Sequence, residues 1–337
     1  MGLSHHGRSE AVDRALSDFG SEESFGQAAK RFKEHYHYAL SSSTASRVTK
    51  QVAQDVQAYV EQQLAETKES SGEASDRGVA TVETMLVELD GCDIRTAQLL
   101  PSKNTTERSP IRQLPKKTKQ INWREVRIGL TRPLESLDKL YIGKMASYPE
   151  VVGQLVDASI LRGMSPETQV VGVADGGNGL KEELERQFGT LQFILDTKHV
   201  KDHLYETAEA LGIGQKERPG WVKAHVAAIS NGDVAQIITE LEDVYTETQN
   251  HRVKRLVGYL HRFADALNYH DFKERGYPVG SGEIESAHKS VPQKRLKLPG
   301  ACWHPDSINP MLSLRILRAN DWWDDFWEDR MEKKLAA

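Results

Sequence analysis

Two apolar segments of strand length are each followed by an Asp-Gly pair, and the two segments are far apart in the chain. Residues 84–89 lead to Asp90, and residues 170–174 lead to Asp175. An isolated Asp-Gly pair is often a hairpin turn. A carboxylate that directly follows a buried strand of an α/β sheet, however, lies at the sheet edge where catalytic groups gather. Because the pattern occurs twice, Asp90 and Asp175 are candidate ligands for a divalent metal ion.

Strand-like and helix-like segments alternate through the middle of the chain. Residues 123–130 and 191–195 also have strand patterns, whereas residues 134–156 and 178–188 have helical periodicity. This alternation predicts an α/β fold around a mixed sheet. Residues 200–277 carry only helical patterns, so we expect a large all-helical insertion there.

The first 78 residues are predicted to form a helical DNA-binding module. One helix begins after Ser24 and the next near Ser43, and the second would expose Arg47 and Lys50 near its start. Helix-turn-helix proteins place such side chains against DNA. The alternative is a simple helical hairpin packed on the catalytic domain.

The remaining boundaries follow from the same patterns. Residues 79–199 are expected to form the first part of the α/β domain, and residues 278–337 a final helix with a Trp-rich tail. Trp322, Trp323 and Trp327 in that tail are predicted to close a core, since aromatic clusters near a chain end usually do so.

Charge and cysteine usage narrow the functional class. The net charge is −5, yet residues 101–128 hold eight basic and two acidic residues. Such a cluster can neutralise phosphates even in an acidic protein, and its candidate DNA contacts are Lys116, Lys117 and Lys119. The two distant cysteines indicate a reducing compartment, and no apolar run reaches the roughly 18 residues of a membrane span. We therefore expect a soluble, cytoplasmic protein without a membrane partner.

Five segments together resemble a known enzyme family. They are VELDGCDIRT, WREVRIGL, VVGVADGGNGL, FILDTKHVKDHL and PVGSGEIESAHKSVPQKRLKLPGACW, in this order between about residues 80 and 330. The chain resembles the Asp-Asp-Glu (DDE) transposases of bacterial insertion sequences, most closely the Kra-type group, which is akin to the mutator-like class. The resemblance implies a ribonuclease H-like catalytic domain.

The resemblance also implies a metal site. Its catalytic carboxylates, which would bind the metal, are Asp90, Asp175 and Glu285. Glu283 is the alternative third ligand. These acids would hold two Mg²⁺ ions, with Mn²⁺ as a substitute, for in-line phosphoryl transfer. Two acidic neighbours are expected to point away from the site because of strand alternation, namely Glu88 and Asp93.

Further residues are assigned around these acids. Asp196 and His199 match an Asp/Cys-x-x-His element of the family and would support the metal ligands from behind. Their alternative roles are a helix cap for Asp196 and an ordinary surface histidine for His199. Arg295 and Lys297 are candidate phosphate contacts, and Trp303 is a candidate for stacking on an exposed base.

The expected activity is metal-dependent DNA cleavage at transposon ends and transfer of the cut strand into target DNA. The partners would be terminal inverted repeats and target DNA, bound by a homodimer or a larger assembly at the nucleoid. Two alternatives stay open: a ribonuclease H-like nuclease that cuts without joining, and a domesticated, non-catalytic DNA-binding protein.

Overall fold

A five-stranded sheet with the order β3-β2-β1-β4-β5 forms the centre of the protein. The computed structural model describes residues 8–69, 80–101 and 117–336. The strands are β1 Thr84–Pro101, β2 Lys117–Pro133, β3 Leu140–Lys144, β4 Gln169–Ala174 and β5 Leu191–Leu195. Strand β2 is antiparallel to both β1 and β3, whereas β4 and β5 run parallel to β1. The sheet is mixed, as the alternating pattern predicts.

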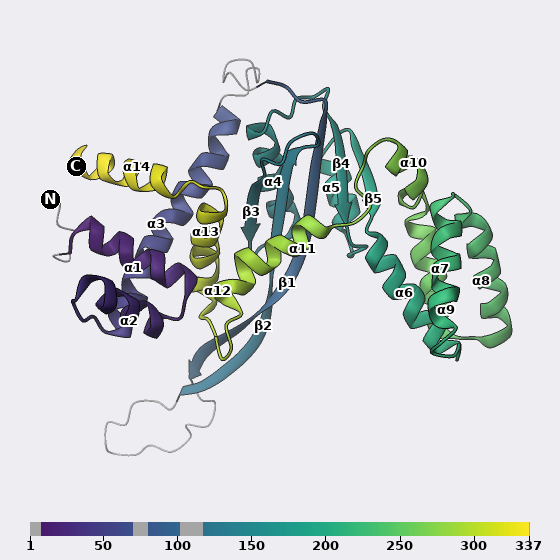
Figure 1. Ribbon diagram of the computed structural model, residues 1–337, viewed down its shortest axis with the longest axis horizontal. Helices are drawn as coiled ribbons and strands as arrows, with labels where there is room; N and C mark the ends of the chain where they lie inside the picture. The colour runs from purple at the N-terminus through teal and green to yellow at the C-terminus, as the bar shows by residue number, and fades with distance from the viewer. Residues whose placement is uncertain (1–7, 70–79, 102–116, 337) are drawn as a thin grey trace.

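Strand β1 is longer than its sequence pattern predicts. Asp90 and Gly91 do not form a turn but lie inside the strand, because β2 supplies backbone partners for β1 from Met85 to Pro101. On the other side, β4 pairs with β1 only as far as Glu88. Beyond that point β1 and β2 continue together as a two-stranded ribbon (Figure 1).

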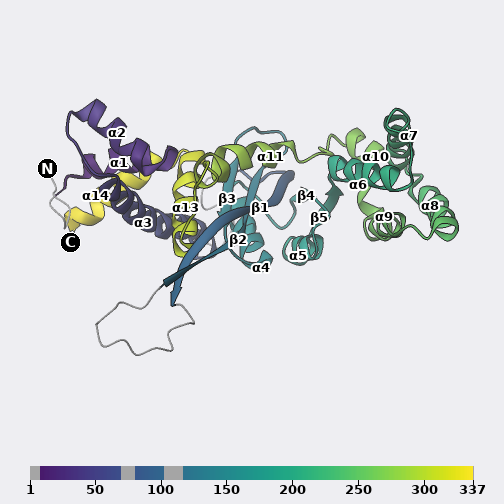
Figure 2. The ribbon, with the colours of Figure 1, turned by 90° about the horizontal axis from the view of Figure 1, so that it is seen from below.

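Strand β3 is a second departure from the sequence pattern. A single helix is predicted over residues 134–156, but this stretch holds β3 and the start of α4, Tyr148–Leu161. Leu140–Lys144 forms a strand because the outer edge of β2 offers its backbone groups as partners. Helices α4 and α5, Leu180–Gln187, lie on one side of the sheet and α11, Gly282–His288, lies on the other (Figure 2).

The segment predicted as an all-helical insertion contains helices in the structure. These are α6 Thr197–Ala210, α7 Arg218–Ser230, α8 Val234–Thr248, α9 His251–Arg262, a short 3-10 turn Ala264–Ala266 and α10 Tyr269–Glu274. They form a bundle at one end of the molecule, beyond β5 (Figures 1 and 2). The chain returns from this bundle to the sheet through α11.

In the described residues before the sheet the helices are α1 Glu10–Glu22, α2 Phe25–Tyr36 and α3 Ser42–Glu69. Ser24 caps α2, as predicted, by accepting a hydrogen bond from the backbone N–H of Gln27. Leu16 and Phe32 belong to a small core shared by these helices. The second half of α3 buries Val56 and Val60 in the main core instead. The N-terminal helices are therefore joined to the sheet domain by shared packing.

The chain ends in α12 Lys294–Leu296, a 3-10 turn Pro305–Ser307, α13 Ile308–Ala319 and α14 Trp323–Ala336. A π-helical turn, Lys289–Gln293, links α11 to α12. Trp323 and Trp327 are buried in the core, and Trp322 packs against it from a partly buried position. The predicted core role of these tryptophans is confirmed. Among the described residues, no helix has the length and apolar character needed to cross a membrane.

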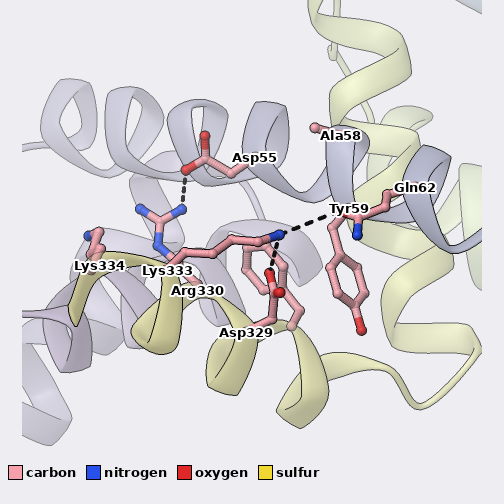
Figure 3. A pocket seen from close by; sticks show the side chains of 9 residues that line it. Asp55, Ala58, Tyr59, Gln62, Asp329, Arg330, Lys333 and Lys334 are labelled. Carbon is pink, nitrogen blue, oxygen red and sulfur yellow. Dashed lines mark hydrogen bonds and ion pairs between the residues drawn. The ribbon is translucent and has the colours of Figure 1, made fainter. Parts of the chain in front are cut away.

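Figure 3 shows a pocket of about 370 Å³ between α3 and α14. Arg330 of α14 forms an ion pair with Asp55 of α3, and Lys333 lies 2.8 Å from Asp329. Lys334 is neutralised by Glu10 of α1. The pocket therefore marks a charged joint that holds the C-terminal helix on the N-terminal helices.

Arg315 of α13 connects the N-terminal helices to the segment after α11. Its buried guanidinium donates hydrogen bonds to the main-chain oxygens of Ser290 at 2.6 Å, Ser21 at 3.2 Å and Val291 at 3.3 Å. It also forms an ion pair with Glu22 at the end of α1. One side chain therefore satisfies several buried acceptors that come from distant parts of the chain.

Arg315→Ala should lower the free energy of unfolding by about 3 kcal/mol or more, because it leaves buried carbonyl oxygens and Glu22 without their donor. Urea denaturation followed by circular dichroism measures this loss. Arg252→Ala is the matched control, since its ion pair with Glu206 is exposed and should contribute little. Equal losses in the two variants would contradict the assignment of Arg315 as the connection.

Candidate active site

Asp90 lies on β1, and Asp175 directly follows the neighbouring parallel strand β4. The last pair of the β1–β4 register is Glu88 opposite Val173, so each acid lies two residues beyond the end of this pairing. Adjacent strands are about 4.8 Å apart. Strand β4 ends at Ala174, so Asp175 stands immediately beyond it. The fold thus brings together two acids that are 85 residues apart in sequence (175 − 90).

The backbone orients both carboxylates. The N–H of Gly91 donates to Oδ1 of Asp90 at 2.7 Å, and the N–H of Gly177 donates to Oδ1 of Asp175 at 3.0 Å. Gly176 also meets a spatial requirement, because a Cβ there would come within 2.5 Å of the Tyr259 ring of α9. The turn after β4 therefore packs directly against the helical insertion.

Two acids hold helix α11 over β1: Glu88 on the strand and Glu283 in the first turn of the helix. Oε2 of Glu88 accepts a hydrogen bond from the backbone N–H of Ile284 at 2.7 Å. Glu283 forms ion pairs with Arg132 at 2.8 Å and Lys139 at 2.9 Å. Glu283 is therefore engaged in anchoring the helix, whereas Glu285 points elsewhere.

Glu285 and His288 are the residues that α11 brings to the site. His288 Nε2 lies 3.2 Å from Oδ2 of Asp90, and Glu285 Oε1 accepts a hydrogen bond from Lys198 Nζ at 2.6 Å. Residues three apart on a helix are neighbours, with Cβ atoms about 5–6 Å apart. Glu285 is consequently one helical turn away from a side chain that touches Asp90.

The pair formed by Asp90 and His288 favours its ionised form. Burial alone would lower the pKa of His288, but contact with Asp90 and Cys92 raises it to about 9. Burial alone would raise the pKa of Asp90, but His288, the Gly91 amide and His199 hold it below its ordinary value. Asp90 is therefore a carboxylate at neutral pH, the form in which an acid binds a cation.

Asp196 and His199 lie at the start of α6, next to this site. Asp196 is buried, caps α6 by accepting a hydrogen bond from Lys198 N–H at 2.7 Å, and accepts another from Ser281 N–H at 3.3 Å. The Ser281 hydroxyl also bonds to Asp196. This carboxylate thus joins the start of α6 to the residue before α11. His199 is half-buried, and its charge acts on Asp90.

Two of the residues expected to contact DNA are buried in the structure. Arg295 donates to the main-chain oxygen of Gly20 at 2.7 Å, and its guanidinium lies over the rings of Phe25 and Trp303. The Trp303 ring is buried, and its Nε1 donates to Leu296 O at 3.0 Å. The prediction that Arg295 contacts a phosphate and Trp303 stacks on a base is therefore wrong, because both side chains are buried in the protein interior.

The other expected DNA contacts are placed differently. Arg47 and Lys297 are exposed, as is Lys119 on β2. Lys50 is half-buried over the Phe25 ring, 5.9 Å from its centroid, and burial lowers its pKa. Lys117 belongs to the first position of β2, and Lys116 lies outside the described residues.

Glu88 and His288 are the site residues that the sequence patterns missed. Glu88 was expected to point away from Asp90, but residues two apart on a strand share a face, so both point toward α11. The same alternation does send Asp93 to the opposite face, where it is exposed. For His288 a signal existed in the three-residue spacing from Glu285 on a helix.

The acids are chemically suited to a hard cation, since Mg²⁺ prefers carboxylate oxygens. Within the described ranges, however, no three Asp, Glu, His or Cys side chains cluster closely enough to hold one metal ion. Glu285 is bound to Lys198, and Asp90 to His288. A complete ligand set requires Glu285 to exchange its partner.

Comparisons with known proteins found distant similarities only. No family model and no curated protein matches the sequence. Among solved structures, the Drosophila P element transposase strand transfer complex aligns at 11% identity over 99% of this chain and 84% of that chain, with a TM-score of 0.29. The Mos1 strand transfer complex aligns at 10% identity over 80% of each chain, with a TM-score of 0.20. TM-scores this low do not establish a shared fold.

Glu88 should make the folded state less stable as pH rises. Its burial raises its pKa from an ordinary 4.5 to about 8, so ionisation is harder in the folded than in the unfolded chain. The resulting penalty grows between pH 4.5 and 8 and is complete above pH 8. Glu88→Gln keeps an acceptor for Ile284 N–H and removes the charge, so its stability relative to wild type should rise across this window.

Urea denaturation at several pH values, in the presence of a metal chelator, measures this effect. Glu283→Gln is the control of opposite sign. Burial opposes the ionisation of Glu283, but Arg132 and Lys139 hold its pKa below its ordinary value, so this variant should lose stability at neutral pH. Parallel pH profiles for wild type and Glu88→Gln would disprove the role of Glu88 as a buried, neutral acid.

Proposed function

We propose that this chain is a DDE-type DNA transposase with a ribonuclease H-like catalytic domain, which cleaves transposon ends and joins them to target DNA. The observation that carries the proposal is the convergence of acids at one edge of the sheet. Asp90 and Asp175 each lie two residues beyond the last β1–β4 pair, and Glu285 lies one helical turn from His288, which touches Asp90. These are the residues that the family motifs select.

The order of elements supports the same proposal. The first acid lies on the central strand, the second follows a parallel neighbour, and the third comes on a helix after the helical bundle. The sequence motifs that resemble bacterial insertion-sequence transposases of the Kra-type group span these same elements. The mixed sheet with a helical insertion agrees with what that resemblance implies.

Asp90, Asp175 and Glu285 are the proposed ligands of two Mg²⁺ ions, for which Mn²⁺ would substitute. When bound, the two ions would activate the attacking oxygen and stabilise the leaving oxygen of a phosphodiester. The amides of Gly91 and Gly177 orient the two aspartates before any cation arrives. Asp196 caps the start of α6, from which Lys198 reaches Glu285, and His199 is the second residue proposed to support the metal ligands.

Lys198 gives Glu285 a reversible partner. Both side chains are partly open to solvent, with 60% of Lys198 and 37% of Glu285 exposed. An exposed ion pair contributes little to stability, so Glu285 can leave Lys198 readily. The released ammonium would then be free to bind a DNA phosphate beside the site.

DNA is the proposed partner in the form of terminal inverted repeats and target DNA. Exposed cations outside the acidic site, Arg47 on α3, Lys119 on β2 and Lys297 after α12, are proposed phosphate contacts. Lys116 and Lys117 belong to the same basic segment as Lys119. Joining two ends requires two active sites, so we propose a homodimer or larger assembly on DNA, acting in the cytoplasm at the nucleoid.

A non-catalytic DNA-binding protein is the second candidate. Within the described part of the chain the carboxylates occur in ion pairs rather than in a metal-ligand cluster, with Glu285 on Lys198 and Asp90 on His288. A former transposase that had lost its metals would keep such pairs. This candidate differs from the enzyme in its response to Asp90→Asn, which should leave every activity of a non-catalytic protein intact.

Asp90→Asn, Asp175→Asn and Glu285→Gln should each lower the rate of Mg²⁺-dependent DNA cleavage at least about 100-fold. DNA affinity, measured by fluorescence anisotropy without Mg²⁺, should change little, because these acids bind cations and not DNA. Asp93→Asn is the matched control, since Asp93 is exposed on the opposite face of β1. The enzyme proposal fails if the three variants cleave like wild type, or if Asp93→Asn is equally damaged.

Strand transfer separates a transposase from a nuclease that only cuts. The purified chain should join the 3′-hydroxyl end of a transposon-end oligonucleotide to plasmid DNA, which agarose gels and sequencing of the junctions detect. Cleavage without any joined product would point to the nuclease instead.

A further inference from the structure

The outer part of the β1–β2 ribbon, residues 94–101 and 117–124, is basic and carries no acid. We call it the distal ribbon. Its charged residues are Arg95, Lys117, Lys119 and Arg124. The whole chain has a net charge of −5, so this concentration of positive charge is local. Figures 1 and 2 show β1 and β2 running on past the other strands of the sheet.

The two faces of the distal ribbon differ where it leaves the sheet. Ile94 and Thr96 on the even-numbered face of β1 are buried at 0% and 1% exposure. The segment at Trp303 anchors this part of β1 through its backbone, with Ala97 N–H donating to Trp303 O at 2.8 Å. The body of the protein therefore supports the ribbon from one side. The odd-numbered face is left open.

Large apolar side chains gather on that open face. Trp123 is 62% exposed, Leu99 62% and Ile121 44%. In the β1–β2 register Trp123 is opposite Arg95, and Leu99 is opposite Lys119, so one face combines apolar and cationic side chains. Single exposed apolar residues are ordinary, but a contiguous set on a supported strand pair indicates a binding surface.

Arg95 and Lys119 on the open face, and Arg124 on the other face, are available to a partner. Across the described residues, the side chains of Arg95, Lys119 and Arg124 form no ion pair and no hydrogen bond. Elsewhere on the molecule comparable arginines are neutralised, as Arg252 is by Glu206. The distal ribbon therefore attracts an anionic partner.

Charge decides between the two occupants that fit an apolar, basic face. A second copy of this chain docked through the same face would oppose one set of cations to another, with no acid on the ribbon to pair with them. A nucleic acid supplies phosphates for the cations and flat bases for Trp123. Base–aromatic stacking tolerates any sequence because every base has a π-face.

We propose that the open face of the distal ribbon binds DNA whose bases are unpaired or unstacked, with Trp123 stacked on a base. Leu99 and Ile121 would press against neighbouring bases, as apolar wedges do in distorted DNA. Arg95 and Lys119 would neutralise the flanking phosphates. The inference rests on the proposed function only in taking DNA as the partner. It assigns a preference for open DNA that base-paired duplex, whose base faces are stacked and covered, cannot satisfy.

Fluorescence anisotropy with the full chain in Ca²⁺ tests the proposal, with a labelled 30-nucleotide single strand and the matching duplex as probes. Trp123→Ala should weaken binding of the single strand by about 5-fold or more, the lower end of the stacking contribution, and affect the duplex less. Trp123→Phe should retain most of the affinity. Lys119→Glu should weaken the binding of both probes and reduce the salt dependence of binding.

Leu137→Ala is the matched control, because Leu137 is 85% exposed outside the ribbon and should change neither probe. The inference is overturned if Trp123→Ala binds the single strand like wild type. It is also overturned if that variant alters only the oligomeric state in analytical ultracentrifugation, which would identify a second copy as the occupant. Binding in Ca²⁺ and DNA cleavage are measured separately. If Trp123→Ala weakens single-strand binding but Asp90→Asn leaves cleavage unchanged, the proposed enzymatic function is wrong and the DNA-binding role of the distal ribbon is retained.

Discussion

The hydrogen bond from the backbone N–H of Ile284 to the buried carboxyl of Glu88 is the contact on which the site depends. It joins a short helix to the central strand across a sequence separation of 196 residues. Helix α11 has only seven residues and could not hold its position alone. The second anchor, Glu283 on Arg132 and Lys139, fixes the rotation of the helix. Together the two contacts decide that His288 meets Asp90 and that Glu285 faces Lys198.

The same arrangement gives neighbouring acids opposite properties. Glu88 and Asp90 are two residues apart on one face of β1, yet burial raises the pKa of Glu88 to about 8. His288 offsets the burial of Asp90 and holds its pKa below the ordinary value. One acid is therefore a neutral structural group and the other a carboxylate. Two acids that are two residues apart on β1 can in this way do different work: Glu88 anchors a helix, and Asp90 presents a carboxylate to a cation.

Much of the architecture followed from local patterns, because those patterns report burial and periodicity. The apolar runs before Asp90 and Asp175 are buried strands, and residues 200–277 are helical. The length of β1 and the existence of β3 could not be read in this way, since both depend on backbone partners supplied by β2. Arg295 and Trp303 were misjudged for a related reason. A basic and an aromatic residue in sequence are typical of a DNA contact, but Arg295 packs on the rings of Phe25 and Trp303, and both residues are buried. Long-range contacts, unlike periodicity, leave no mark on the neighbouring sequence.

The central claim is that Asp90, Asp175 and Glu285 share divalent cations. Anomalous diffraction from a crystal of the full chain soaked in Mn²⁺ tests it most directly. We expect manganese between the carboxylates of Asp90 and Asp175, at oxygen distances of roughly 2.0–2.2 Å, with Glu285 moved from Lys198 onto the metal. Manganese bound elsewhere, or Glu285 still paired with Lys198 at saturating Mn²⁺, would contradict it.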